Sequence, residues 1–113
     1  MLSLQEFIDI TAPKTENITE YNNIRINSRG LISFDGKYNI IDYDNNVLYT
    51  IEFRITINKQ RKLNVMMKGV KDYKAYYRYK QYHVKDNLVQ LFQGWLYEYQ
   101  EDLIKFLYKR KWF

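Results

Sequence analysis

The stretch VLYTIEFRITIN, residues Val47–Asn58, alternates two kinds of side chain. From Tyr49 to Ile57 every second residue is aromatic or β-branched and apolar, and the residues between them are Thr, Glu and Arg. This alternation is typical of a strand with one buried and one solvated face. Twelve residues exceed the common strand length of about five or six. The stretch therefore predicts the central strand of an antiparallel sheet whose apolar face is covered by other elements.

Shorter segments of similar character lie on both sides of this strand. Each alternates apolar with polar residues over a few positions, and residues that favour turns separate them. The segments are Asn23–Asn27, Leu31–Phe34, Lys37–Tyr43 and Leu63–Met67. Together with Val47–Asn58 they predict a meander of four to five antiparallel strands.

Four turns are predicted between these strands. Asp35-Gly36 is the strongest short-range hairpin signal, because both central residues of a type I′ turn need a positive φ. Ser28–Gly30 and Asp44–Asn46 contain residues that favour turns or tolerate the left-handed region, and Lys59–Lys62 predicts a charged hairpin tip.

Helices are expected at both ends of the chain. Ser3 can cap a short helix together with Glu6, and Pro13 predicts that this helix stops by the residue before it. Near the C-terminus, apolar residues recur every three or four positions from Asp86, a candidate N-cap, to Lys109. Gly94 interrupts this stripe, and we expect it either to permit a close approach to the sheet or to divide the segment into two helices.

The segment Val70–Val84 fits two patterns. Tyr73 and Tyr77 share a helical face with Val70, whereas Tyr77 and Tyr79 also fit strand alternation. We favour a helix, because Lys, Ala, Arg and Gln are interspersed and the meander is complete without another strand. The whole pattern predicts an α+β fold, with a short N-terminal helix and one or two C-terminal helices packed on one face of the sheet.

Length and composition limit the classes of protein. The 113 residues suit one domain, residues 1–113, with its own core. The absence of cysteine excludes disulfides and thiolate metal sites, and no secretory signal or membrane-spanning run is visible, so we expect a cytoplasmic protein. The abundance of Ile, Asn, Lys, Tyr and Phe, which have A/T-rich codons, suggests a low-GC genome of a bacterium, phage or mobile element.

Charge is distributed unevenly along the chain. Residues 1–46 hold four Lys and Arg against seven Asp and Glu, whereas residues 47–113 hold fourteen against six. Within the second part, Lys59–Lys85 contains nine basic residues and only one acid, Asp72. Such a segment attracts polyanions.

Tyrosines interleave with the basic residues in this segment. Basic side chains neutralise phosphates and aromatic rings stack on bases, as sequence-tolerant binding of single strands requires. The alternative is that the tyrosines pack at the edge of the core while the lysines are solvated. The candidate residues for binding nucleic acid or another partner are Lys59, Arg61, Lys62, Lys71, Lys74, Tyr76, Arg78, Tyr79, Lys80 and Tyr82.

Aromatic residues are unusually frequent, at 18% of the chain. Tyr and Trp are preferred anchors of protein interfaces. Trp112 and Phe113 at the C-terminus are candidate anchors for a protein partner. The alternative is that they fold back onto the sheet.

Signatures of catalysis are weak. Asp42, followed ten residues later by Glu52 and Arg54, resembles the D…ExK arrangement of the PD-(D/E)XK nucleases, and the resemblance implies a divalent metal held by the two acids. Arg54 replaces the lysine of that motif, and a cross-strand ion pair is the simpler role for such residues. His83 is the only histidine, so neither a nucleophilic triad nor a histidine-based metal site is expected.

Two functional hypotheses follow from these features. The first is a non-enzymatic protein, without cofactor or metal, that engages nucleic acid or a nucleoprotein complex through its basic, tyrosine-rich surface. The second is a protein-interaction module, such as a phage or mobile-element inhibitor of a host nucleic-acid-processing enzyme. In outline, the order helix, meander, helices is similar to some anti-CRISPR proteins. Both hypotheses are compatible with a homodimer. A metal-dependent nuclease that uses Asp42 and Glu52 is the third hypothesis.

Overall fold

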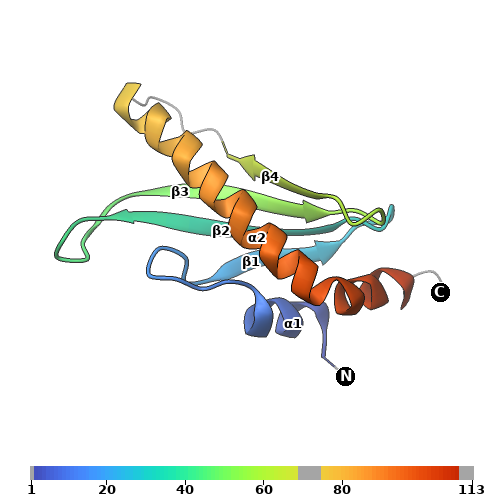
Figure 1. Cartoon of the computed structure of the whole chain (residues 1–113). Helices are drawn as coiled ribbons and strands as arrows, with labels where there is room; N and C mark the ends of the chain where they lie inside the picture. The colour runs from blue at the N-terminus through green and yellow to red at the C-terminus, as the bar shows by residue number, and fades with distance from the viewer. Residues whose placement is uncertain (1, 69–74, 110–113) are drawn as a thin grey trace.

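The computed structural model describes residues 2–68 and 75–109. The elements follow in the order α1 (Leu4–Thr11), β1 (Tyr21–Ile26), β2 (Ile32–Ile41), β3 (Val47–Ile57), β4 (Leu63–Met67) and α2 (Ala75–Lys109). The strands form one antiparallel sheet in the order β1-β2-β3-β4. Helix α2 crosses one face of this sheet, and α1 lies beside β1 (Figure 1). The predicted α+β fold is therefore confirmed.

The predicted N-terminal cap is present in α1. The Ser3 hydroxyl accepts a hydrogen bond from the Glu6 backbone N–H, and the Glu6 carboxylate accepts one from the Ser3 N–H. Ala12 is extended at the other end, directly before Pro13. Phe7 is buried against Tyr99 and Phe106 of α2, so this short helix is held by tertiary packing.

The strand β3 is an interior strand of the sheet, between β2 and β4, and its alternation buries one face as predicted. Ile51, Phe53, Ile55 and Ile57 are buried on the face that α2 covers. The core also receives Phe34 from β2 and two aromatic residues from α2. The rings of Phe34, Phe92 and Trp95 lie with their centroids 5.8–5.9 Å apart.

The predicted hairpin at Asp35-Gly36 is wrong, because both residues lie inside β2. Gly36 pairs with Phe53 of β3, and a Cβ atom at Gly36 would clash with the Phe53 ring. The glycine thus leaves room for an aromatic ring from the neighbouring strand. The two short strands predicted on either side of the false turn form the single strand β2, so the sheet has four strands.

The other three predicted turns are confirmed, and they share one geometry. They occupy Asn27–Leu31, Asp42–Asn46 and Asn58–Lys62. In each, a side-chain oxygen of the first residue accepts hydrogen bonds from the backbone N–H groups of the third and fifth residues at 2.8–3.0 Å. The fourth residue has a positive φ in each turn, and these residues are Gly30, Asn45 and Arg61.

Helix α2 differs from the expected boundaries. It begins at Ala75 and runs without interruption to Lys109, so Asp86 is an interior residue and not the N-cap. The predicted helix in Val70–Val84 is confirmed from Ala75 onward, while residues 70–74 lie outside the described residues. Gly94 neither divides the helix nor approaches the sheet, because it is exposed and no atom lies within 4 Å of the position of a Cβ.

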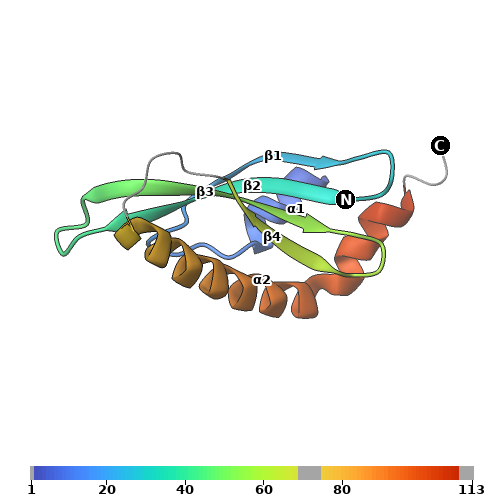
Figure 2. The ribbon, with the colours of Figure 1, turned by 90° about the horizontal axis from the view of Figure 1, so that it is seen from above.

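Both helices lie on the same side of the sheet (Figure 2). The C-terminal turns of α2, red in Figure 2, bend away from the direction of the first turns. In the part of the chain that the structure describes, nothing packs on the opposite face of the sheet (Figure 2), which we call the open face. No helix in the described ranges is both long and apolar enough to cross a membrane.

Candidate nucleic-acid interface

The predicted binding residues fall into two groups that are far apart in space. Lys59, Arg61 and Lys62 lie in the turn between β3 and β4, and the Arg61 guanidinium donates a hydrogen bond to Gln100 near the end of α2 at 3.2 Å. The other group lies on the first turns of α2, gold in Figure 1, at the opposite end of the molecule. Twenty residues of helix separate Lys80 from Gln100, which is about 30 Å.

Only part of the second group lies within the described residues. The helix α2 includes Tyr76, Arg78, Tyr79, Lys80 and Tyr82. Lys71 and Lys74 lie outside the described residues, as do the predicted partner anchors Trp112 and Phe113. The fold thus divides the predicted surface, because β4 leads away from the β3–β4 turn and α2 then runs back to it.

Two hairpin turns meet at the end of the molecule that holds Lys59. The β1–β2 turn and the β3–β4 turn lie next to each other (Figure 2), and a groove of about 290 Å³ runs between them. Lys59 also borders Ile104 and Leu107 of α2. The groove is lined by Asn27, Arg29, Gly30, Leu31, Asn58, Lys59 and Gln60.

Gly30 allows this close approach. Its φ is +76°, in the left-handed region that glycine adopts at little cost. A Cβ atom at Gly30 would clash with the Lys59 side chain. The glycine therefore serves both the turn and the contact between the two turns.

The end where these turns meet is rich in unpaired cations. Arg29, Lys59 and Lys62 are all exposed, and among the described residues no carboxylate forms an ion pair with them. Among the described residues, the hydrogen bond of the Arg61 guanidinium goes to the neutral Gln100 side chain. We call Arg29, Lys59, Arg61 and Lys62 the basic end. Their positive potential is not cancelled locally, so it attracts polyanions.

Arg29 was not among the predicted residues. It is 30 residues from Lys59 in sequence, and it stands in the part of the chain that is acidic overall. Only the antiparallel order of the strands brings the β1–β2 and β3–β4 turns to the same end of the sheet. The sequence signal that relates the two turns is an Asn at the first position of each, which suits the turn geometry that they share.

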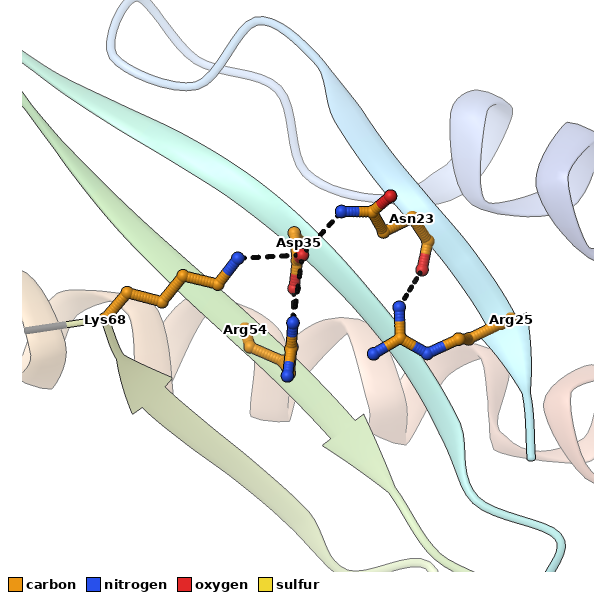
Figure 3. A network of polar contacts seen from close by, with 5 residues as sticks. All are labelled: Asn23, Arg25, Asp35, Arg54 and Lys68. Carbon is orange, nitrogen blue, oxygen red and sulfur yellow. Dashed lines mark hydrogen bonds and ion pairs between the residues drawn. The ribbon is translucent and has the colours of Figure 1, made fainter. Parts of the chain in front are cut away.

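A second cluster of charges lies on the open face (Figure 3). The carboxylate of Asp35 accepts hydrogen bonds from Arg54 Nε at 2.7 Å, Asn23 Nδ2 at 2.9 Å and Lys68 Nζ at 3.0 Å. Asp35 is only 4% exposed although it points away from the helices. Burial raises the pKa of Asp35, but the hydrogen bonds from Arg54, Asn23 and Lys68 outweigh this effect and hold the pKa well below its usual range.

A bulge in β1 brings Asn23 into this cluster. The pairing of β1 with β2 passes from Asn22 opposite Asp35 to Arg25 opposite Ser33, so β1 contains one extra residue there. Asn23 has a φ of 53°, which asparagine tolerates better than most residues. The bulge directs the Asn23 amide to Asp35.

The acids of the predicted nuclease site do not come together. Glu52 pairs with Lys37 in the sheet, and Asp42 follows Lys37 by five residues, which is about 16 Å along a strand. Backbone and side-chain hydrogen bonds from Asn46 and Asp44 occupy the Asp42 carboxylate. The Asn46 N–H bond is the largest cause of the lowered pKa of Asp42. Within the described ranges no cluster of three or more acids or histidines could hold a metal ion.

The cross-strand ion pair that the sequence predicts for this region is present at Arg54. Arg54 of β3 pairs with Asp35 of β2. His83 is exposed on α2.

Comparisons of the chain with protein-family models, with curated proteins and with solved structures find no match.

Proposed function

We propose that this protein binds nucleic acid, without catalysis, through the basic end. The observation that carries the proposal is the convergence of two hairpin turns, which places Arg29 and Lys59 on one groove with Arg61 and Lys62 beside them. Exposed cations without carboxylate partners are suited to phosphates, which they neutralise with release of counterions. The compartment that we propose is the cytoplasm, as the cysteine-free sequence predicts.

The mode of recognition follows from the kinds of side chain at the basic end. Lysine and arginine in exposed turns contact the phosphate backbone, which carries no sequence information directly. We therefore expect weakly sequence-selective binding with a steep dependence on salt. Four phosphate contacts correspond to a slope of log K against log salt of about −3 to −4.

The test is a salt titration of binding with a labelled oligonucleotide of mixed sequence, measured by fluorescence anisotropy. A triple variant carries Arg29→Gln, Lys59→Gln and Lys62→Gln. We expect it to bind at least about tenfold more weakly at moderate salt, with a slope reduced by about 2–3.

The matched control loses the same charge elsewhere on the molecule. Lys14, Lys37 and Lys85 are exposed and lie outside the basic end, and the control replaces all three with Gln. An equal loss of affinity in the control would assign binding to net charge alone and contradict the proposal, as would the absence of oligonucleotide binding by the wild-type protein.

A protein partner is the second candidate, and the far end of the sheet favours it. The β2–β3 hairpin ends in large apolar side chains that are exposed: Tyr43 fully, Leu48 by 63% and Val47 by 55%. Such residues anchor protein interfaces. An inhibitor of a host nucleic-acid-processing enzyme, such as a CRISPR enzyme, or a homodimer would use this end, while the predicted anchors Trp112 and Phe113 lie outside the described residues.

This second candidate has its own test. Light scattering coupled to size-exclusion chromatography compares the wild-type protein with a Tyr43→Ser, Leu48→Ser variant. A dimer that the variant converts to a monomer would support self-association through this end. A monomer in both cases, with oligonucleotide binding intact, would contradict it.

A further inference from the structure

The open face of the sheet contains a buried serine, Ser33, whose hydroxyl has no hydrogen-bond partner in the described ranges. Ser33 alternates with Ile32 and Phe34, both fully buried on the helix side, so its side chain points to the open face. It is nevertheless only 5% exposed, and among the described residues its Oγ makes no hydrogen bond. A buried polar group without a partner is unfavourable, so the unpartnered hydroxyl calls for a physical reason.

The neighbours of Ser33 explain its burial. Ser33 pairs with Arg25 of β1 on one side and with Thr56 of β3 on the other. Neither helix lies on this face (Figure 2), so Ser33 is flanked here by the residues of the two neighbouring strands.

The charges around Ser33 are unbalanced. Arg54 and Lys68 both pair with Asp35, and the Arg25 side chain extends from β1 toward the same cluster (Figure 3). Three cations thus surround one carboxylate, which leaves two surplus positive charges. Asp35 accepts hydrogen bonds from Nε and one terminal nitrogen of Arg54, so it fixes that guanidinium. The other terminal nitrogen makes no hydrogen bond within the described part of the chain.

Arg25 is the least engaged of these cations. Among the described residues its guanidinium makes one long hydrogen bond, from Nη1 to the Asn23 carbonyl oxygen at 3.4 Å. Arginine has five N–H donors in a planar fork that matches the oxygens of a phosphate. Most of the Arg25 donors are therefore available to a ligand.

We infer that Arg25, Arg54 and Ser33 form a second contact site for nucleic acid, in which a backbone phosphate inserts between the two guanidinium groups and accepts a hydrogen bond from the Ser33 hydroxyl. Lys68 adds a positive charge beside this site, next to Asp35. The inference rests on the proposed function, which it extends from the basic end onto the open face. Arg25 lies four residues before Arg29, so the same strand leads from one contact to the other.

The chemistry of the open face supports a phosphate over a base. Around Ser33, the described residues of this face are Arg25, Asp35, Arg54 and Thr56, and none of these four is aromatic. A face without rings offers no stacking platform, whereas guanidinium groups and a hydroxyl are frequent partners of phosphate oxygens.

Two single variants test this site by oligonucleotide binding and its salt dependence. Ser33→Ala removes only the unpartnered hydroxyl, and we expect about three- to tenfold weaker binding with unchanged or higher thermal stability. Arg25→Gln should weaken binding by a similar factor and reduce the salt slope by about 0.7–0.9. A purely structural role of Ser33 would leave binding unchanged.

Lys37→Gln is the matched control for Arg25→Gln. Lys37 is exposed on the same face, but it lies opposite Glu52 in the register, so we expect no more than a small change. If Ser33→Ala and Arg25→Gln both bind like the Lys37→Gln variant, the inference is overturned while binding through the basic end stands. If the wild-type protein binds no oligonucleotide, the proposed function and this inference fall together.

A phosphate can also belong to a lipid headgroup. Phosphatidylglycerol vesicles serve as the comparison probe. Vesicle binding that Ser33→Ala and Arg25→Gln abolish, without oligonucleotide binding by the wild-type protein, would overturn the assignment to nucleic acid.

Discussion

The Arg54 guanidinium reaches across from β3 to the Asp35 carboxylate on β2, with Nε 2.7 Å from Oδ1 and a terminal nitrogen 3.3 Å from Oδ2. The two residues are directly paired in the sheet. Arg54 is 31% exposed while the Asp35 side chain is only 5% exposed. One buried carboxylate thus organises the polar side chains of the open face.

Replacing Asp35 with Asn should destabilise the protein. The change leaves Arg54 and Lys68 without a counter-charge, but both are about one-third exposed, so water offsets part of the loss. We expect the free energy of unfolding to fall by about 1–3 kcal/mol, measured by urea denaturation. Asp44→Asn, in an exposed turn, is the control, and an equal effect of the two changes would refute the role of the cluster.

The same carboxylate predicts a pH dependence of stability. The pKa of Asp35 is lower in the folded protein than in the unfolded chain, where it is about 3.9. Between these two values the unfolded state binds more protons, so stability falls as the pH falls. The stability gap between the wild-type protein and Asp35→Asn should be full above about pH 5 and should shrink at lower pH. The midpoints of urea denaturation of both proteins across this pH range measure the stability gap. A gap that does not change with pH would contradict the lowered pKa of Asp35.

Two glycines should respond to alanine in opposite directions. A Cβ at Gly36 would strike the ring of Phe53, which is fully buried and cannot yield, so Gly36→Ala should cost about 1–3 kcal/mol. Gly94 is exposed in a helix with open space around it, so Gly94→Ala should add about 1 kcal/mol. Thermal melts of both variants give the signs directly, and a destabilising Gly94→Ala would disprove the uninterrupted helix.

The separation of the predicted surface into two groups predicts unequal effects of charge reversal. Lys59→Glu with Lys62→Glu changes the basic end, whereas Lys74→Glu with Arg78→Glu changes the segment around the start of α2. Both pairs of substitutions change the net charge equally. A difference in oligonucleotide affinity between them, measured by fluorescence anisotropy, therefore reports the position of the charges on the molecule. We expect the first pair to weaken oligonucleotide binding by a larger factor for all sequences. A larger effect of the second pair would move the binding surface to the tyrosine-rich segment.

Much of the candidate site could not be derived from sequence. Lys59, Arg61 and Lys62 were predicted as a charged tip, and the turn that holds them has the expected place. Arg29 joins them only because β1 and β2 fold onto the same sheet as β3 and β4. The sequence predicts a turn at Asp35, because Asp followed by Gly is a local turn signal. The partners that hold Asp35 in a strand, Arg54 and Lys68, lie 19 and 33 residues away and give no local signal.

The sequence by itself determined the elements that depend on local physics. The alternation around Ile51–Ile57 specifies a strand with one buried face, and Ser3 and Glu6 specify a helix start. The apolar stripe from Leu88 to Leu107 specifies a helix that packs on the sheet. Each of these signals lies within a few residues of the structure it specifies.

Only the tertiary structure decided what depends on residues that are distant in sequence. It made Asp35 and Gly36 part of a strand, because a ring and a guanidinium from β3 fit them there. It also separated Lys59 from the start of α2 and joined it to Arg29. The physical reason is that strand order and helix direction set these distances, and neither is encoded in the pattern of any single segment.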